Sequence, residues 1–89
     1  MNDDLDGVTS LALDARAGDR GALARFVRAT QHDVWWFAAL LADVGVAGKL
    51  AVETFERAMA VLPRYSGRLS ARTWLLAIAR RVVLEHLRW

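Results

Sequence analysis

Apolar side chains recur at intervals of three and four residues along most of this chain, and that spacing is typical of α-helices with one buried face. The longest stripe lies between residues 20 and 43 and consists of Leu23, Phe26, Val27, Thr30, Val34, Phe37, Ala38 and Leu41. Later stripes consist of Leu50, Thr54, Ala58 and Val61, and of Leu75, Ile78, Ala79, Val82 and Val83. The pattern predicts an all-helical fold.

Residues that start or stop helices divide this pattern into four predicted helices, at about 8–17, 20–43, 46–62 and 71–87. Asp19 and Ser70 are placed to cap the second and the last helix. Gly45 is expected to stop the second helix, and Pro63 ends the third because its ring and missing N–H forbid continuation. We therefore expect a compact bundle of about four helices over residues 11–89, after a flexible N-terminus at residues 1–10.

Composition narrows the function further. The 89 residues provide for one core, and no cysteine is present, so disulfides and thiolate metal sites are excluded. The two histidines are far apart, and we expect no metal, no cofactor and no enzymatic activity, since no nucleophile–base pair or glycine-rich loop stands out. No apolar run is long enough to cross a bilayer and the acidic start is unlike a signal peptide, so we expect a cytoplasmic protein without membrane contact.

Charge is distributed unevenly along the chain. Residues 1–56 hold five Lys or Arg against nine Asp or Glu, whereas residues 57–89 hold seven Arg against the single Glu85. This asymmetry favours a polyanion on the basic side, because the planar guanidinium pairs with phosphates and stacks on bases. Arg80, Arg81 and Arg88 are the best candidates for phosphate contacts. A solvated arginine-rich helix would show the same pattern, and that alternative stays open.

The segment between the last two helices mixes cations, hydroxyls and an aromatic ring. It offers Arg64, Tyr65, Ser66 and Arg68, and Arg72 and Thr73 follow at a helix N-terminus, where backbone N–H groups attract anions. Such a loop is suited to hold an unpaired base by stacking and hydrogen bonds. An ordinary surface turn is the alternative. Trp74 is a candidate strand-separating wedge, although an aromatic at core spacing is more often core.

From Leu11 to Trp89 the chain resembles region two of extracytoplasmic-function (ECF) sigma factors of the sigma-70 family. The resemblance rests on the following pieces, in this order: Ala17-Gly18-Asp19 with Ala22-Leu23 and Phe26, Val34-Trp35 with Phe37, Leu50, Glu53-Thr54-Phe55 with Arg57-Ala58, Leu62-Pro63-Arg64-Tyr65, Ser70 to Arg80, and Glu85-His86-Leu87-Arg88. They keep family order and spacing across about nine-tenths of the chain.

The resemblance implies a domain with two surfaces that supports transcription initiation. One surface would dock on the beta-prime clamp of RNA polymerase core through Lys49, Leu50, Glu53, Thr54, Phe55 and Arg57. The other would capture the single-stranded non-template strand of the promoter minus-ten element through Arg64, Tyr65, Ser66, Arg68, Ser70, Arg72, Thr73, Trp74, Arg80, Arg81 and Arg88. An anti-sigma factor is a further expected partner.

Departures from the family pattern support a second hypothesis. The family usually reads Asp-Asp-Leu-Val-Gln-Glu-Thr-Phe where this chain has Gly48-Lys49-Leu50-Ala51-Val52-Glu53-Thr54-Phe55, so two acids and a glutamine are replaced. Of the Trp35–Trp36 pair, one ring is expected to cover a partner or an interface, since both cannot point inward. The alternative is therefore a diverged module that binds another protein and no longer docks on the polymerase. The helix-turn-helix of a second DNA-binding domain is not in the sequence, and we expect an excised fragment rather than a free-standing protein.

Overall fold

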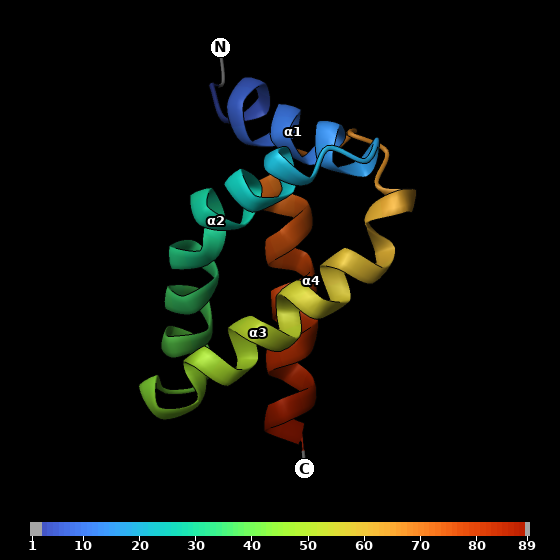
Figure 1. Cartoon of the computed structure of the whole chain (residues 1–89). Helices are drawn as coiled ribbons and strands as arrows, with labels where there is room; N and C mark the ends of the chain where they lie inside the picture. The colour runs from blue at the N-terminus through green and yellow to red at the C-terminus, as the bar shows by residue number, and fades with distance from the viewer. Residues whose placement is uncertain (1–2, 89) are drawn as a thin grey trace.

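The computed structural model describes residues 3–88, with side chains from residue 7 onwards. It contains α1 (Asp3–Arg16), α2 (Arg20–Leu41), α3 (Val44–Val61), a short 3-10 helix η1 (Leu62–Arg64) and α4 (Ala71–Arg88), and these described residues form no strand. The predicted all-helical bundle is confirmed. α1 lies across one end of the molecule against α2 and α4, and α3 crosses α4 obliquely (Figure 1).

The first helix begins earlier than predicted. α1 starts at Asp3 rather than near Val8, and Val8 and Thr9 are only 7% and 6% exposed. These two residues are therefore buried against the other helices, and the boundary between a flexible N-terminus at residues 1–10 and a domain at residues 11–89 stays a prediction. Residues 1 and 2 lie outside the described part of the chain.

Most helix boundaries follow the capping residues. The Asp19 side chain accepts a hydrogen bond from Ala22 N at 3.0 Å, and Ser70 Oγ accepts one from Thr73 N at 3.2 Å, so both predicted caps are confirmed. Gly45 was wrongly predicted as a helix stop. It lies in the first turn of α3, where its N–H donates to the carboxylate of Asp43, which is the N-cap.

Two groups of buried residues form the core. The larger includes Phe26, Val34, Leu62 and Leu75, and the smaller includes Leu50, Val82 and Val83 together with Ala38, Ala39 and Ala47. Thr30 is buried with its hydroxyl hydrogen-bonded, because the hydroxyl donates to the carbonyl of Phe26 at 2.8 Å. Leu41 differs from the prediction: it is 48% exposed, because α2 ends at this residue and the next one, Ala42, no longer has helical backbone angles. No buried polar side-chain atom from residue 7 onwards lacks a partner.

Candidate nucleic-acid interface and docking surface

Tyr65 anchors the segment between η1 and α4, residues 65–70, which is called the 65–70 loop below. Its side chain is 3% exposed, its hydroxyl donates to the carbonyl of Leu69 at 2.6 Å, and its ring centroid lies 4.8 Å from that of Trp74. Gly67 reverses the chain between them with a φ of +84°, which favours glycine. Tyr65 therefore stabilises the loop from its buried side. Its ring is not exposed, so it is not available to stack on a base.

Helix α1 contacts the same loop from the other side. Arg16 Nη1 donates to the carbonyl of Tyr65 at 2.6 Å, and the Thr9 hydroxyl accepts the N–H of Ala71 at 2.9 Å. A methyl group added at Gly67 would lie 3.4 Å from the side chain of Leu13, so Leu13 faces this part of the loop. Sequence reasoning missed Thr9, Leu13 and Arg16, since nothing in a local pattern links residues about 50 positions apart.

The N-terminus of α4 is largely occupied by the chain's own oxygens. Besides the bond from Thr73 N to Ser70 Oγ, the N–H of Ala71 is taken by Thr9 and that of Trp74 donates to the carbonyl of Ser70 at 3.0 Å. The predicted anion site at this helix start therefore has few donors left. Thr73 is exposed, Ser70 is half-buried, and Ser66 is exposed with its hydroxyl accepting the backbone N–H of Arg68.

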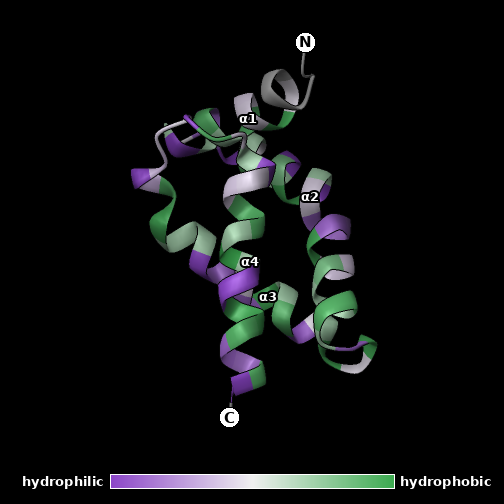
Figure 2. Ribbon diagram, turned by 180° about the vertical axis from the view of Figure 1, so that it is seen from behind, coloured by the Kyte–Doolittle hydropathy of each residue, from purple (hydrophilic) through white to green (hydrophobic). Residues whose placement is uncertain are grey.

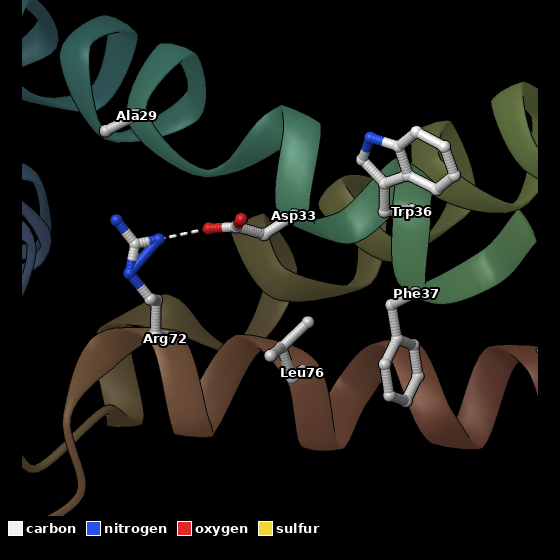
Figure 3. A pocket seen from close by; sticks show the side chains of 6 residues that line it. All are labelled: Ala29, Asp33, Trp36, Phe37, Arg72 and Leu76. Atoms are coloured by element: carbon white, nitrogen blue, oxygen red, sulfur yellow. Dashed lines mark hydrogen bonds and ion pairs between the residues drawn. The ribbon is translucent and has the colours of Figure 1, made fainter. Parts of the chain in front are cut away.

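Arg72 points away from the loop toward α2. Its guanidinium forms an ion pair with Asp33, and the two side chains face each other between α2 and α4 (Figure 3). They line an open hollow of about 540 Å³ together with Ala29, Trp36, Phe37 and Leu76. Because Asp33 already neutralises this cation, a phosphate would have to compete with a carboxylate for Arg72.

The remaining basic residues of the C-terminal third face solvent. Arg64 and Arg68 lie at and within the loop, and Arg80, Arg81 and Arg88 lie on the exposed side of α4. From residue 7 to residue 88, none of these five side chains forms an ion pair or hydrogen bond with another residue. Arg72 and Arg80 are separated by about 12 Å along the helix axis, so the cations extend along α4 rather than forming one cluster. Figure 2 shows α4 in front, with hydrophilic bands at intervals along its length.

Arg57 connects α3 to α4. Its guanidinium donates to both carboxylate oxygens of Glu85 and to Glu53 at 2.8 Å. The hydrogen bonds from Arg57 lower the pKa of Glu85, with Arg81 and Arg88 adding a smaller electrostatic effect in the same direction. Both carboxylates raise the pKa of Arg57 in turn. Arg57 is therefore paired with one carboxylate on its own helix, α3, and with another on α4.

The six residues predicted for docking on the clamp divide into two groups. Leu50 and Thr54 are each 1% exposed, and the Thr54 hydroxyl donates to the carbonyl of Leu50 at 2.8 Å. These two are core residues, so their prediction as direct contacts is corrected. Lys49 is exposed, and Glu53, Phe55 and Arg57 are half-buried. The surface that α3 offers includes these four residues, Glu56, and Val52, which is 61% exposed.

Next to this surface, α2 and α3 form a shallow groove of about 390 Å³. Its lining is mainly apolar and consists of Val27, Gln31, Ala51, Val52, Phe55, Glu56 and Met59. Val52 stands here in the position that the family pattern gives to glutamine, so this residue makes the groove more apolar. An apolar groove between helices is a common receptor for a partner's helix.

The two tryptophans on α2 are adjacent in sequence, so their rings cannot both face the core. Trp36 is 47% exposed and Trp35 is half-buried, with the rings edge to face at a centroid distance of 5.2 Å. Trp36 Nε1 donates to His32 Nε2 at 2.6 Å. Trp74 is half-buried against Tyr65 and the larger core cluster, which favours its interpretation as a core residue over a wedge.

The described residues provide neither a metal site nor a membrane-spanning helix. Among them, no three His, Cys, Asp or Glu side chains lie close enough to hold a metal ion. None of the described helices combines the length and apolarity needed to cross a membrane.

Comparison with known proteins identifies the relatives of this chain. Over 85 residues it is 58% identical to a probable RNA polymerase sigma-C factor of Mycobacterium bovis and to the ECF RNA polymerase sigma factor SigC of Mycobacterium tuberculosis. The match covers 96% of this chain and 46% of each relative, so the chain spans about half the length of the curated relatives it matches. No protein-family model matches it. The resemblance predicted from the motifs is thus confirmed, and this chain is related in sequence to the extracytoplasmic-function sigma factors of RNA polymerase.

Proposed function

We propose that this chain is a promoter-recognition domain of an ECF-type sigma factor. In this function the 65–70 loop and the exposed side of α4 bind the non-template strand of the minus-ten element, and the α3 surface docks on the beta-prime clamp of RNA polymerase. The names of the relatives support the polymerase as a partner. Promoter DNA follows from the same relationship, and an anti-sigma factor is a further proposed partner.

The observation that carries the proposal is the position of the exposed cations that form no hydrogen bond or ion pair within residues 7–88. Arg64 precedes the anchored loop, Arg68 lies within it, and Arg80, Arg81 and Arg88 are exposed on the helix that follows it. A strand lying from the loop along α4 would meet exposed guanidinium groups at Arg80, Arg81 and Arg88, in the second half of that helix. Phosphate contacts of this kind fix the position of a strand, and contacts in the loop provide sequence preference.

Four of the predicted contacts take indirect or conditional roles in this proposal. Tyr65 and Trp74 support the loop from below, and Arg72 reaches a phosphate only by leaving Asp33. Ser66 and Thr73 are exposed and are proposed to contact the strand directly, with Ser70 holding the helix start beside them. On α3, Lys49, Glu53, Phe55 and Arg57 are proposed to contact the clamp.

A binding titration tests the proposal. The purified chain is titrated with core RNA polymerase, with a labelled pool of single-stranded DNA that has a randomised centre, and with both together. We expect binding to core polymerase and, in its presence, enrichment of one short sequence from the pool. Binding to neither would overturn the proposal.

A second candidate function is favoured by the exposed apolar residues. Val52 and Trp36 are 61% and 47% exposed, and Val52 lines the apolar groove between α2 and α3. A diverged module that binds another protein through the groove at Val52, or through Trp36 beside the hollow between α2 and α4, would leave core polymerase unbound in the same titration. The result with core polymerase alone therefore separates the two functions.

A further inference from the structure

Three residues on one face of α1 lie beside the 65–70 loop and the start of α4. Thr9, Leu13 and Arg16 are spaced by four and three residues, so they lie on the same side of the helix. Arg16 holds the beginning of the loop at the Tyr65 carbonyl, Leu13 faces its middle at Gly67, and Thr9 holds the residue that follows it, Ala71. The helix therefore bonds the first residue of the loop and the first residue of α4, which lie on either side of the turn at Gly67.

The loop depends on these contacts because it has few of its own. Within it, the Tyr65 hydroxyl bonds the carbonyl of Leu69, and the Ser66 hydroxyl accepts the N–H of Arg68. Among the contacts from α1, the hydrogen bond from Arg16 is expected to be the strongest, because its donor is charged and lies 2.6 Å from the carbonyl oxygen of Tyr65. A loop that is already in its binding conformation loses less entropy when it captures a ligand.

We propose that the Thr9–Leu13–Arg16 face of α1 sets the shape of the 65–70 loop, and that Arg16 is a positioning residue for recognition of the minus-ten strand. This inference rests on the proposed function. Arg16 acts through the Tyr65 carbonyl, and its guanidinium makes no contact with the strand. Sequence preference, which the loop provides, then depends on Arg16, whereas the number of phosphate contacts does not.

The test uses the strand that the unmodified chain enriches from the randomised pool in the presence of core polymerase. Affinities for that strand and for a scrambled strand of the same composition are measured at several salt concentrations. For Arg16→Ala we expect the preference for the enriched strand to fall by about tenfold, the effect of losing one charge-assisted hydrogen bond. The slope of log K against log salt is expected to stay unchanged.

Two matched variants define the alternatives. Arg20→Ala removes an exposed arginine at the start of α2, where no hydrogen bond to the loop exists, and should leave the preference intact. Arg68→Ala removes a proposed phosphate contact and should lower the slope by about 0.7, the value for one contact with a single strand. A slope reduction of that size in Arg16→Ala would show direct contact with the strand and overturn the positioning role.

Two further measurements keep the test decisive. In the chain without DNA, Arg16→Ala should shift the amide resonances of Ser66 and Gly67, and Arg16→Lys, which keeps a donor and a charge, should restore part of the preference. An Arg16→Ala variant that is folded and keeps the full preference overturns the inference. If the unmodified chain enriches no sequence, the proposed function fails, and that result is distinct from failure of the role of Arg16.

Discussion

Arg57 on α3 and Glu85 on α4 form a forked ion pair, in which Nη1 donates to Oε2 at 3.1 Å and Nη2 donates to Oε1. Glu85 is the single acidic residue among the last 33 residues, and it lies near Arg81 and Arg88 as well. The pair therefore joins the proposed docking helix to the proposed DNA-binding helix. It also places a negative charge on the helix that is proposed to bind the strand.

Replacing this carboxylate should strengthen DNA binding. In Glu85→Gln, Arg57 keeps only Glu53 as a charged partner, and the field around Arg81 and Arg88 becomes more positive. We expect tighter binding of single-stranded DNA and a salt slope that is steeper by up to about 0.7 for each additional phosphate contact. Stability should change little at neutral pH, because Glu85 is exposed and Arg57 is only half-buried, so water screens the pair. Salt-dependent binding and thermal unfolding are the measurements, and a weaker affinity for DNA would contradict the prediction.

The same carboxylate should make stability depend on pH. Hydrogen bonds from Arg57 hold the pKa of Glu85 below its ordinary value of 4.5 in the folded chain. The unfolded chain then binds more protons in this range, so the contribution of Glu85 is present above pH 4.5 and is lost as the pH falls through the lowered pKa. Denaturant unfolding between neutral and acid pH measures it. Glu85→Gln is the control, and its stability should fall less steeply; identical curves for the two proteins would contradict the role of Glu85.

The arginine pair on the outer side of α4 gives a direct test of the strand path. Arg80→Ala with Arg81→Ala should weaken single-strand binding and reduce the salt slope by about 1.4, the value for two phosphate contacts. Both residues are exposed and make no ion pair within residues 7–88, so folding should be unaffected. Arg25→Ala, an exposed arginine on α2, is the matched control. An unchanged slope in the double variant would exclude the outer side of α4 as the strand path.

The local features of this fold were predictable because their causes are local. Ser70 caps α4 and Asp19 caps α2, since in each case a short polar side chain precedes an apolar stripe. The α2–α3 boundary was misplaced for a similar reason. Asp43 has the same capping chemistry as Asp19 and begins α3, whereas the apolar stripe that ends at Leu41 favours a longer α2 with its stop at Gly45.

The partners of the site residues were not predictable, because they depend on how helices cross. Arg72 meets Asp33 and Arg57 meets Glu85 across separations of 39 and 28 residues. A count of arginines in the C-terminal third cannot distinguish these two engaged cations from the exposed ones. The same limit applies to Tyr65, whose loop position suggested an accessible ring although the fold buries it.

The exposed fraction of each side chain separates the core residues of α3 from those that are available to a partner. Leu50 lies in the smaller core cluster and is 1% exposed, so Leu50→Ala should destabilise the domain by about 2–5 kcal/mol. Val52 is 61% exposed, and Val52→Asp should change stability by no more than about 0.5 kcal/mol. The two variants therefore separate loss of folding from loss of a surface.

If α3 docks on the polymerase clamp, Val52→Asp should weaken binding to core polymerase while thermal unfolding stays unchanged, because it places a charge in the apolar groove beside Phe55. Leu50→Ala should weaken the same binding only to the extent that it unfolds the domain, and stabilising conditions should restore it. Lys49→Asp, which returns the acid of the family pattern to an exposed position, should strengthen binding. Core polymerase affinity that is equal in the unmodified chain, Val52→Asp and Lys49→Asp would show that the clamp does not use this surface.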